Sequence, residues 1–511
     1  MRFFNSLRNS AFAFLGQIIT ILLGFVVRWF FIKKLGQDFL GVNSVMESIL
    51  AILSMTELGI GTSVAFALYK PIDDGDEKRV GSLMAFYRKT YHVLGLITLI
   101  VGPLLIPFMK FFTREAANVG SLSLIYLLFL ANSVLSYFLA YKRTLLSAYQ
   151  QNYINSLSED LFAVLKYILQ AIALIFFQSY IGYLVINVVC TVSANLVIST
   201  LCNKKYPFIK NYKKEKLLPE DKQMLKKSIV SLMYQKIGAK LVTGTDNLMI
   251  SYAKLSLMGI YSNYAMIVSI VSRVVYNVLH SMLGSIGNLM VQKDPDHKYK
   301  VFEEFAFATF AFYFLISIGL SACLERFIFL WAGDGWVLSP TVTFVVILNF
   351  FLMGMRQPNV IVIEAAGLFN RLRLKAIGEV IVNLVVSFIF LIVFDMGIYG
   401  VLFGTTVSMV SICIWWEILA VHKYALEVSS KRYYFEFIKS LLVASLGCFG
   451  AYFISVKIPA DGFSGLILSG ICAVLLFCIL ILVFYGRSRQ LKAIVGRFLK
   501  KRTASPLPET D

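Results

Sequence analysis

The sequence predicts an all-α integral membrane protein of about fourteen transmembrane helices, in two parallel six-helix lobes related by a pseudo-two-fold axis along the membrane normal, with two extra C-terminal helices. Three observations predict this fold class: the composition, the length of the apolar runs and an internal repeat. The chain has 511 residues, of which 58% are hydrophobic and 15% are charged. Soluble domains carry about 25% charged residues. This difference, together with a mean hydropathy of +0.75, excludes a water-soluble fold.

Apolar runs that are long enough to cross a bilayer recur along the whole chain. A membrane-spanning helix needs about 20 mostly apolar residues. The segments that meet this requirement are 10–32, 40–69, 91–109, 119–141, 161–177, 181–202, 226–252, 255–290, 302–324, 336–365, 372–394, 397–421, 435–456 and 463–485. The first run lacks a small-residue cleavage site, so we interpret it as a retained anchor.

The distribution of Lys and Arg predicts the orientation of the spans. With the N-terminus inside, cytoplasmic segments hold about five times as many basic residues as outer loops, so both termini are expected in the cytoplasm. The densest basic stretches are 204–227 and 487–502. The net charge of +19 then reflects topology and attraction to an anionic leaflet, and no nucleic-acid partner is expected. A second interpretation, that these stretches recruit an anionic lipid-linked substrate, stays open.

An internal repeat divides the chain into related halves. At one constant offset, Leu40-Gly41-Val42 falls on Met258-Gly259-Ile260 and Ile181-Gly182 falls on Tyr399-Gly400. Each half has six spans, an even number, so the repeats are parallel and not inverted. The predicted parts are an N-lobe at 1–205, a basic cytoplasmic linker at 206–225, a C-lobe at 226–424, two further spans at 425–485 and a basic cytoplasmic tail at 486–511.

Two facing bundles imply a central cleft that opens alternately to each side of the membrane. Such a cleft is complete within one chain, so a monomer is the default. A channel would not require this pairing of halves, and an enzyme would require groups that the outer loops do not provide.

Ionisable residues within spans cost about 2.5–3.5 kcal/mol each on the insertion scale, so they are candidates for function. Lys236 and Lys240 share one helical face near the middle of their span, with Asp246 beyond them. Two like charges on a buried face repel each other unless an anion lies against them. We therefore predict that this face lines the cavity.

Further charges in spans are candidates of two kinds. Possible cavity cations are Arg273, Arg356 and Arg28, and the last corresponds to Asp246 at the repeat offset. Arg28 could pair with Asp246 or reach the outer surface, and both interpretations remain open. Carboxylates expected to balance charge or take up a coupling proton are Glu47, Glu57, Asp246, Glu364 and Glu379, whereas Glu417 is expected to snorkel to the surface. An excess of cations suits a substrate that bears phosphate.

Metal, cofactor and catalytic sites are not expected. All seven Cys lie within spans and lack the spacing of metal ligands or of a disulfide framework. The four His are scattered near span ends.

Two stretches carry a resemblance to a known family. The first runs from Phe31 to Tyr91 and contains the LG-x-x-x-LG turn at Leu35 to Gly41 and the ELGIG sequence at Glu57 to Gly61. The second is TDNLMISYAKLSLMGIYSNY, from Thr245 to Tyr264. In their order and placement these motifs resemble bacterial polysaccharide repeat-unit flippases of the Wzx type, in the polysaccharide transporter branch of the multidrug, oligosaccharidyl-lipid and polysaccharide exporter superfamily.

The resemblance implies a flippase in the bacterial plasma membrane. Such a protein moves an undecaprenyl-diphosphate-linked oligosaccharide from the inner to the outer leaflet through a basic cavity, for capsule, exopolysaccharide or O-antigen assembly. Its expected partners are that substrate, membrane lipids and polysaccharide assembly proteins such as the polymerase. The same resemblance makes Arg28, Lys236, Lys240, Arg273 and Arg356 cavity candidates.

Two alternatives remain. A multidrug or toxic-compound exporter of the same superfamily should have an acidic or neutral cavity. A membrane-embedded polysaccharide polymerase or glycosyltransferase should expose acid/base side chains on a sizeable outer loop. The longest outer loops expected here are short and hold no His.

Overall fold

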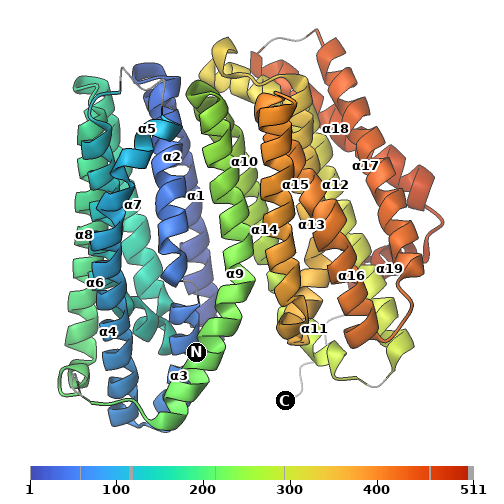
Figure 1. The fold of residues 1–511 in the computed structure, drawn as a ribbon. Coiled ribbons are helices and arrows are strands. Elements are labelled where there is room, and N and C mark those ends of the chain that lie inside the picture. The colour runs from blue at the N-terminus through green and yellow to red at the C-terminus, as the bar shows by residue number, and fades with distance from the viewer. Residues whose placement is uncertain are drawn as a thin grey trace. The chain divides into compact units, whose positions relative to one another are not determined.

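The computed structural model describes residues 2–57, 59–113, 119–212, 215–292, 294–459 and 462–503, and the regular secondary structure of this part is entirely helical (Figure 1). The chain divides into two compact units, Met1–Ser262 and Asn263–Asp511. Each unit has its own arrangement of packed helices.

The first unit begins with a long helix and ends within α10 (Leu255–His280). Its elements are α1 (Arg2–Lys34), α2 (Gln37–Leu53), η1 (Ser54–Glu57), α3 (Ile60–Asp73), α4 (Glu77–Val101), η2 (Gly102–Leu105), α5 (Ile106–Phe112), α6 (Leu122–Ala148), α7 (Asn152–Phe176), α8 (Tyr180–Lys205), η3 (Pro207–Lys210) and α9 (Pro219–Ala253). A buried core of α3, α4, α6 and α8 side chains holds one end of it together, where Leu83, Leu145 and Leu146 are fully buried.

The second unit comprises the rest of α10 and the helices that follow it. They are α11 (Leu283–Met290), α12 (Pro295–Ala332), η4 (Asp334–Trp336), α13 (Pro340–Ala365), η5 (Leu368–Leu372), α14 (Arg373–Phe388), η6 (Ile389–Val393), α15 (Gly397–Ser408), η7 (Met409–Ile414), α16 (Trp415–Val421), η8 (His422–Leu426), α17 (Lys431–Lys457), α18 (Gly462–Tyr485) and α19 (Arg489–Thr503). Phe302, Phe314 and Ile318 on α12 are fully buried in its core.

The prediction of an all-α integral membrane protein is confirmed. Eleven helices in the described part of the chain are long and apolar enough to cross a membrane. The remaining expected spans are also helical, in α2 with α3, in α7 and in α9. The span expected at 255–290 is shorter than predicted, because α10 ends at His280 and α11 is a separate helix.

The ELGIG sequence marks a break between α2 and α3. Gly59 has φ +90°, a left-handed conformation that a residue with a Cβ rarely adopts. A Cβ at this position would also lie 2.7 Å from the Cβ of Leu232 on α9. The break therefore needs glycine both for its backbone angle and for its close packing on α9.

Two glycines that correspond in the internal repeat make reciprocal contacts. A Cβ added at Gly41 on α2 would lie 2.3 Å from the carbonyl oxygen of Leu255 on α10. A Cβ added at Gly259 on α10 would lie 2.1 Å from the carbonyl oxygen of Gln37 on α2. The repeat offset that carries Gly41 onto Gly259 also carries Gln37 onto Leu255. A two-fold relation between α2 and α10 requires this exchange, so the contacts agree with the repeat read from the sequence.

The boundary between the compact units differs from the lobe boundary expected at the linker 206–225. Helix α9 belongs to the first unit because it packs on α2 and α3. Its first turn is also tied to α4, where Arg79 Nε donates to Asp221 Oδ2 at 3.0 Å and Arg79 Nη2 donates to Asp221 Oδ1 at 2.6 Å. The lobes at 1–205 and 226–424 describe the repeat, and they stay a prediction.

Candidate functional site

The first unit places an arginine between two helices within the apolar part of the chain. Arg28 on α1 is half-buried, and its Nη2 donates a hydrogen bond to the Ser262 hydroxyl on α10. The side chain thus reaches a neighbouring helix that lies far along the sequence. This contact ties the guanidinium to α10 within the first unit.

Asp246 lies on α9 and is 7% exposed. The helix is close to α2 here, because Asn247 Nδ2 donates to Ser48 Oγ at 3.0 Å and Gly244 faces Ile52. A buried carboxylate in a membrane-spanning helix is a candidate for function by default. Its pairing with Arg28 across the repeats stays a prediction.

A carboxylate on α2 is exposed among buried neighbours. Glu47 is exposed, although the surrounding residues 40–46, 48 and 49 are all buried. Asn43 Nδ2 donates to Glu47 Oε1 at 2.9 Å, and Tyr180 on α8 donates from its hydroxyl to Asn43 Oδ1 at 3.3 Å. Together with Arg28 and Asp246, these side chains form a polar region in the first unit that could bind phosphate and sugar hydroxyls.

Glu57 lies apart from that region, in the break between α2 and α3. Its Oε1 accepts a hydrogen bond of 2.5 Å from the hydroxyl of Tyr91 on α4, which is 4% exposed. The Tyr91 ring in turn packs edge-on against Tyr87 and Tyr137. The contact ties the break to the tyrosine cluster of the core.

The lysine pair occupies the apolar half of α9. Lys240 is exposed and lies about 20 Å before the end of the helix at Ala253, at roughly 1.5 Å per residue. The Lys236 side chain lies outside the described residues. Since both positions belong to one continuous helix at i, i+4, they share a face. Their role in the cavity stays a prediction.

The second unit contains a buried cluster of four charges that joins three helices. Arg356 on α13 donates from Nε to Glu417 Oε2 at 3.0 Å and from Nη2 to Glu417 Oε1 at 2.6 Å, and its Nη1 lies 3.7 Å from Glu379 Oε1 on α14. Lys375 Nζ on α14 lies 2.9 Å from both Glu379 Oε2 and Glu417 Oε1. Two cations and two carboxylates balance, so charge balance explains Glu379 and much of Arg356.

Two members of this cluster differ from the sequence-based expectation. Glu417 was expected to snorkel, and that prediction is wrong because its side chain is 3% exposed and accepts from Arg356. Lys375 was not singled out as a candidate within the span at 372–394, yet its side chain is 13% exposed and lies in the cluster. The i, i+4 spacing of Lys375 and Glu379 is the signal that could have revealed the pair.

The other candidates of the second unit are dispersed. Arg273 on α10 is exposed. Glu364 at the end of α13 lies 3.1 Å from His280 Nε2. Among the residues that the structure describes, no group of three His, Cys, Asp or Glu side chains could hold a metal ion.

Solved structures of membrane transporters share this fold. An inward-facing multidrug resistance MATE family transporter of the MOP superfamily matches with a TM-score of 0.65 at 12% identity, covering 80% of this chain and 95% of that one. The lipid II flippase MurJ in an inward closed conformation matches with a TM-score of 0.64 at 13% identity, covering 93% of this chain and 99% of that one. A MATE structure in a bent conformation has a TM-score of 0.52 at 13% identity.

The chain therefore shares the fold of these solved transporter structures. No protein-family model and no curated protein sequence matches the chain. The likeness is one of fold, since the sequence identities are low.

If the chain exports the lipid-linked oligosaccharide that the family resemblance implies, we expect Arg28→Ala to reduce that export only partially, because the side chain is shared with Ser262 and is one of several candidate cations. Surface polymer and protein abundance, measured together in complemented cells, test this expectation. Arg28→Lys serves as the control that keeps the charge. Complete loss of export in Arg28→Ala at normal abundance would contradict the expectation and make Arg28 indispensable.

Proposed function

We propose that the protein is a flippase that moves an undecaprenyl-diphosphate-linked oligosaccharide from the inner to the outer leaflet of a bacterial plasma membrane. The observation that carries the proposal is the extent of the structural match. The lipid II flippase covers 93% of this chain, whereas the MATE transporter covers 80%. The match to the flippase thus includes about an eighth of this chain that the match to the MATE transporter leaves out. This difference is expected if the flippase, which handles a lipid-linked substrate, also has the two helices that lie beyond the repeat here.

The charges of the spans support an anionic substrate. Lys236, Lys240, Arg273 and Arg28 would hold the diphosphate, because guanidinium and ammonium groups form strong, charge-assisted hydrogen bonds with phosphate oxygens. The polar side chains around Glu47 would meet sugar hydroxyls. Arg356 was predicted as a further cavity cation. Its Nε and Nη2 donate to Glu417, so it is less available than the other cations to bind a diphosphate.

The transport cycle in this proposal is alternating access, with the diphosphate entering from the cytoplasmic side. Glu47, Glu57 and Asp246 are the candidates for coupling or charge balance. We also propose a monomer with both termini in the cytoplasm that delivers its cargo to a polysaccharide polymerase and other assembly proteins.

A multidrug exporter is the second candidate, because the MATE transporter matches with a similar TM-score. An exporter of organic cations would need a cavity with carboxylates in excess. Loss of the gene would then sensitise cells to cationic drugs and leave surface polysaccharide unchanged.

The deciding experiment identifies the intermediate that accumulates in a strain lacking the gene and determines the leaflet in which it lies. We expect a lipid-linked repeat unit that stays on the cytoplasmic leaflet, protected from periplasmic probes, because glycan synthesis continues while transfer stops. Complementation with the intact chain should clear it. Surface-exposed, unpolymerised repeat units would identify a polymerase, and an unchanged lipid-linked pool would refute the flippase.

A further inference from the structure

A second basic site lies in the first unit, away from the polar region described above. A cavity of about 220 Å³ opens between α4, α6 and α8, where Arg88 and Lys142 carry its charge and His92 adds a neutral polar side chain. By the predicted orientation, the start of α4 and the ends of α6 and α8 are cytoplasmic. The cavity therefore lies at the depth of the cytoplasmic leaflet headgroups.

The cavity is built from buried polar groups. Lys142 is 9% exposed, and its Nζ donates to Ser199 Oγ at 2.7 Å and to Asn203 Oδ1 at 2.8 Å, both on α8. These bonds fix the ammonium group at the wall, and Arg88 and His92 lie one turn apart on the facing helix α4. Among the described lining residues there is no Asp or Glu. The electrostatic character of the site thus favours an anion.

Apolar side chains continue from the cavity toward the membrane interior. On α4, Val93, Leu96, Ile97 and Ile100 are 44–68% exposed and follow directly after His92. On α8, exposed Val197 and Leu201 flank Ser199. Exposed aliphatic strips in a membrane-spanning helix contact acyl chains. A phosphate in the cavity would therefore have room for hydrocarbon tails beside it.

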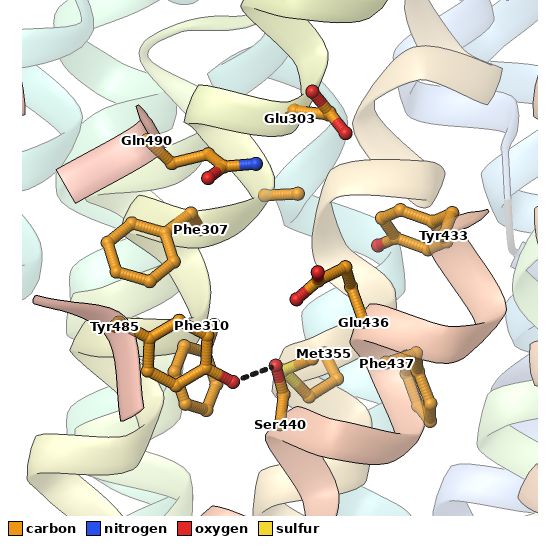
Figure 2. A pocket seen from close by; sticks show the side chains of 11 residues that line it. Glu303, Phe307, Phe310, Met355, Tyr433, Glu436, Phe437, Ser440, Tyr485 and Gln490 are labelled. Atoms are coloured by element: carbon orange, nitrogen blue, oxygen red, sulfur yellow. Dashed lines mark hydrogen bonds between the residues drawn. The ribbon is translucent and has the colours of Figure 1, made fainter. Parts of the chain in front are cut away.

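The corresponding position of the second unit is bordered by the two helices beyond the repeat. At the repeat offset, Ala85, Arg88 and His92 fall on Glu303, Ala306 and Phe310 of α12. That part of α12 faces the two helices beyond the repeat, in a pocket that includes Tyr433 and Ser440 of α17 and Tyr485 of α18 (Figure 2). Ser440 Oγ and Tyr485 Oη lie 2.9 Å apart there. In the first unit, the described residues that line the basic cavity come from α4, α6, α8 and η3.

We propose that the cavity at Arg88, His92 and Lys142 binds the phosphate of an anionic phospholipid from the cytoplasmic leaflet. The guanidinium fork and the ammonium group match phosphate oxygens. Basic pockets between transmembrane helices on this side of a membrane are suited to anionic headgroups. The site is separate from the transport cavity and does not depend on which substrate the protein carries.

The test is thermal unfolding of the full-length protein in detergent, with added phosphatidylglycerol, phosphatidylcholine or inorganic phosphate. Phosphatidylglycerol should raise the melting temperature by about 5 °C, as expected for a ligand near saturation that binds only the folded state. Arg88→Gln and His92→Gln should each lose most of this rise. Lys89→Gln is the matched control, because Lys89 is the exposed neighbour of Arg88, is charged alike and does not line the cavity.

The outcomes separate the possible sources of phosphate. A rise with phosphatidylglycerol alone that survives in Lys89→Gln and is lost in Arg88→Gln supports the proposal. An equal rise with inorganic phosphate would overturn the assignment to a lipid, and an equal rise with phosphatidylcholine would overturn the need for net negative charge. If Arg88→Gln lowers the basal melting temperature, lipid retained on the intact protein in native mass spectrometry provides the same comparison with His92→Gln.

Discussion

A Glu417→Gln variant is expected to unfold at a markedly lower temperature than the wild type. Glu417 accepts two hydrogen bonds from Arg356 and lies 2.9 Å from Lys375 Nζ. Neutralising it leaves two cations against the one carboxylate of Glu379. Removing one partner of a buried ion pair costs about 3–5 kcal/mol, because a buried charge loses its compensation.

Thermal unfolding of the purified protein in detergent measures this effect. Glu427→Gln provides the matched control, since that carboxylate is exposed just beyond η8. Adding Lys375→Met to Glu417→Gln makes the cluster neutral again, so the double variant should recover part of the lost melting temperature. If Glu417→Gln melts at the wild-type temperature, the four charges contribute nothing to stability.

The second large effect concerns transport. Lys236→Ala combined with Lys240→Ala is expected to leave abundance unchanged and to abolish export of the polysaccharide. Hydrogen bonds to charged groups contribute about 1.5–3 kcal/mol each, so losing two should weaken binding of the diphosphate about a hundredfold or more. Surface polymer in complemented cells is the measurement.

The same helix supplies the control for this variant. Lys222→Ala with Lys226→Ala removes two lysines at the same spacing from the exposed first part of α9, which is expected in the cytoplasm. That variant should export normally. Normal surface polymer in cells that carry the Lys236→Ala, Lys240→Ala variant would contradict the assignment of this pair to the cavity.

The length of the apolar runs was enough to predict the helices, because a membrane-spanning helix must satisfy its own backbone and cover it with apolar side chains. The break at Gly59 was less predictable. The ELGIG motif was visible, but its φ and its packing against Leu232 depend on α9, which follows much later in the sequence.

The pairing of charges could not be read from the sequence as a whole. Depth along a span suggested that Glu417 could reach the surface, whereas its partner Arg356 lies on a helix two spans earlier. The sequence indicates how deep a charge lies in the membrane and leaves open which helix its side chain faces. Only the contact between Lys375 and Glu379, one turn apart on α14, was available locally.

The reciprocal contacts of Gly41 and Gly259 have an evolutionary consequence. A contact in which each partner offers the same position to the other is isologous, as in a homodimer with two-fold symmetry. Two separate copies of one repeat could form it before any linker joined them. The crossing of α2 and α10 is thus the kind of contact that duplication and fusion of one repeat would leave, and a side chain at either glycine would collide with the backbone of the other helix.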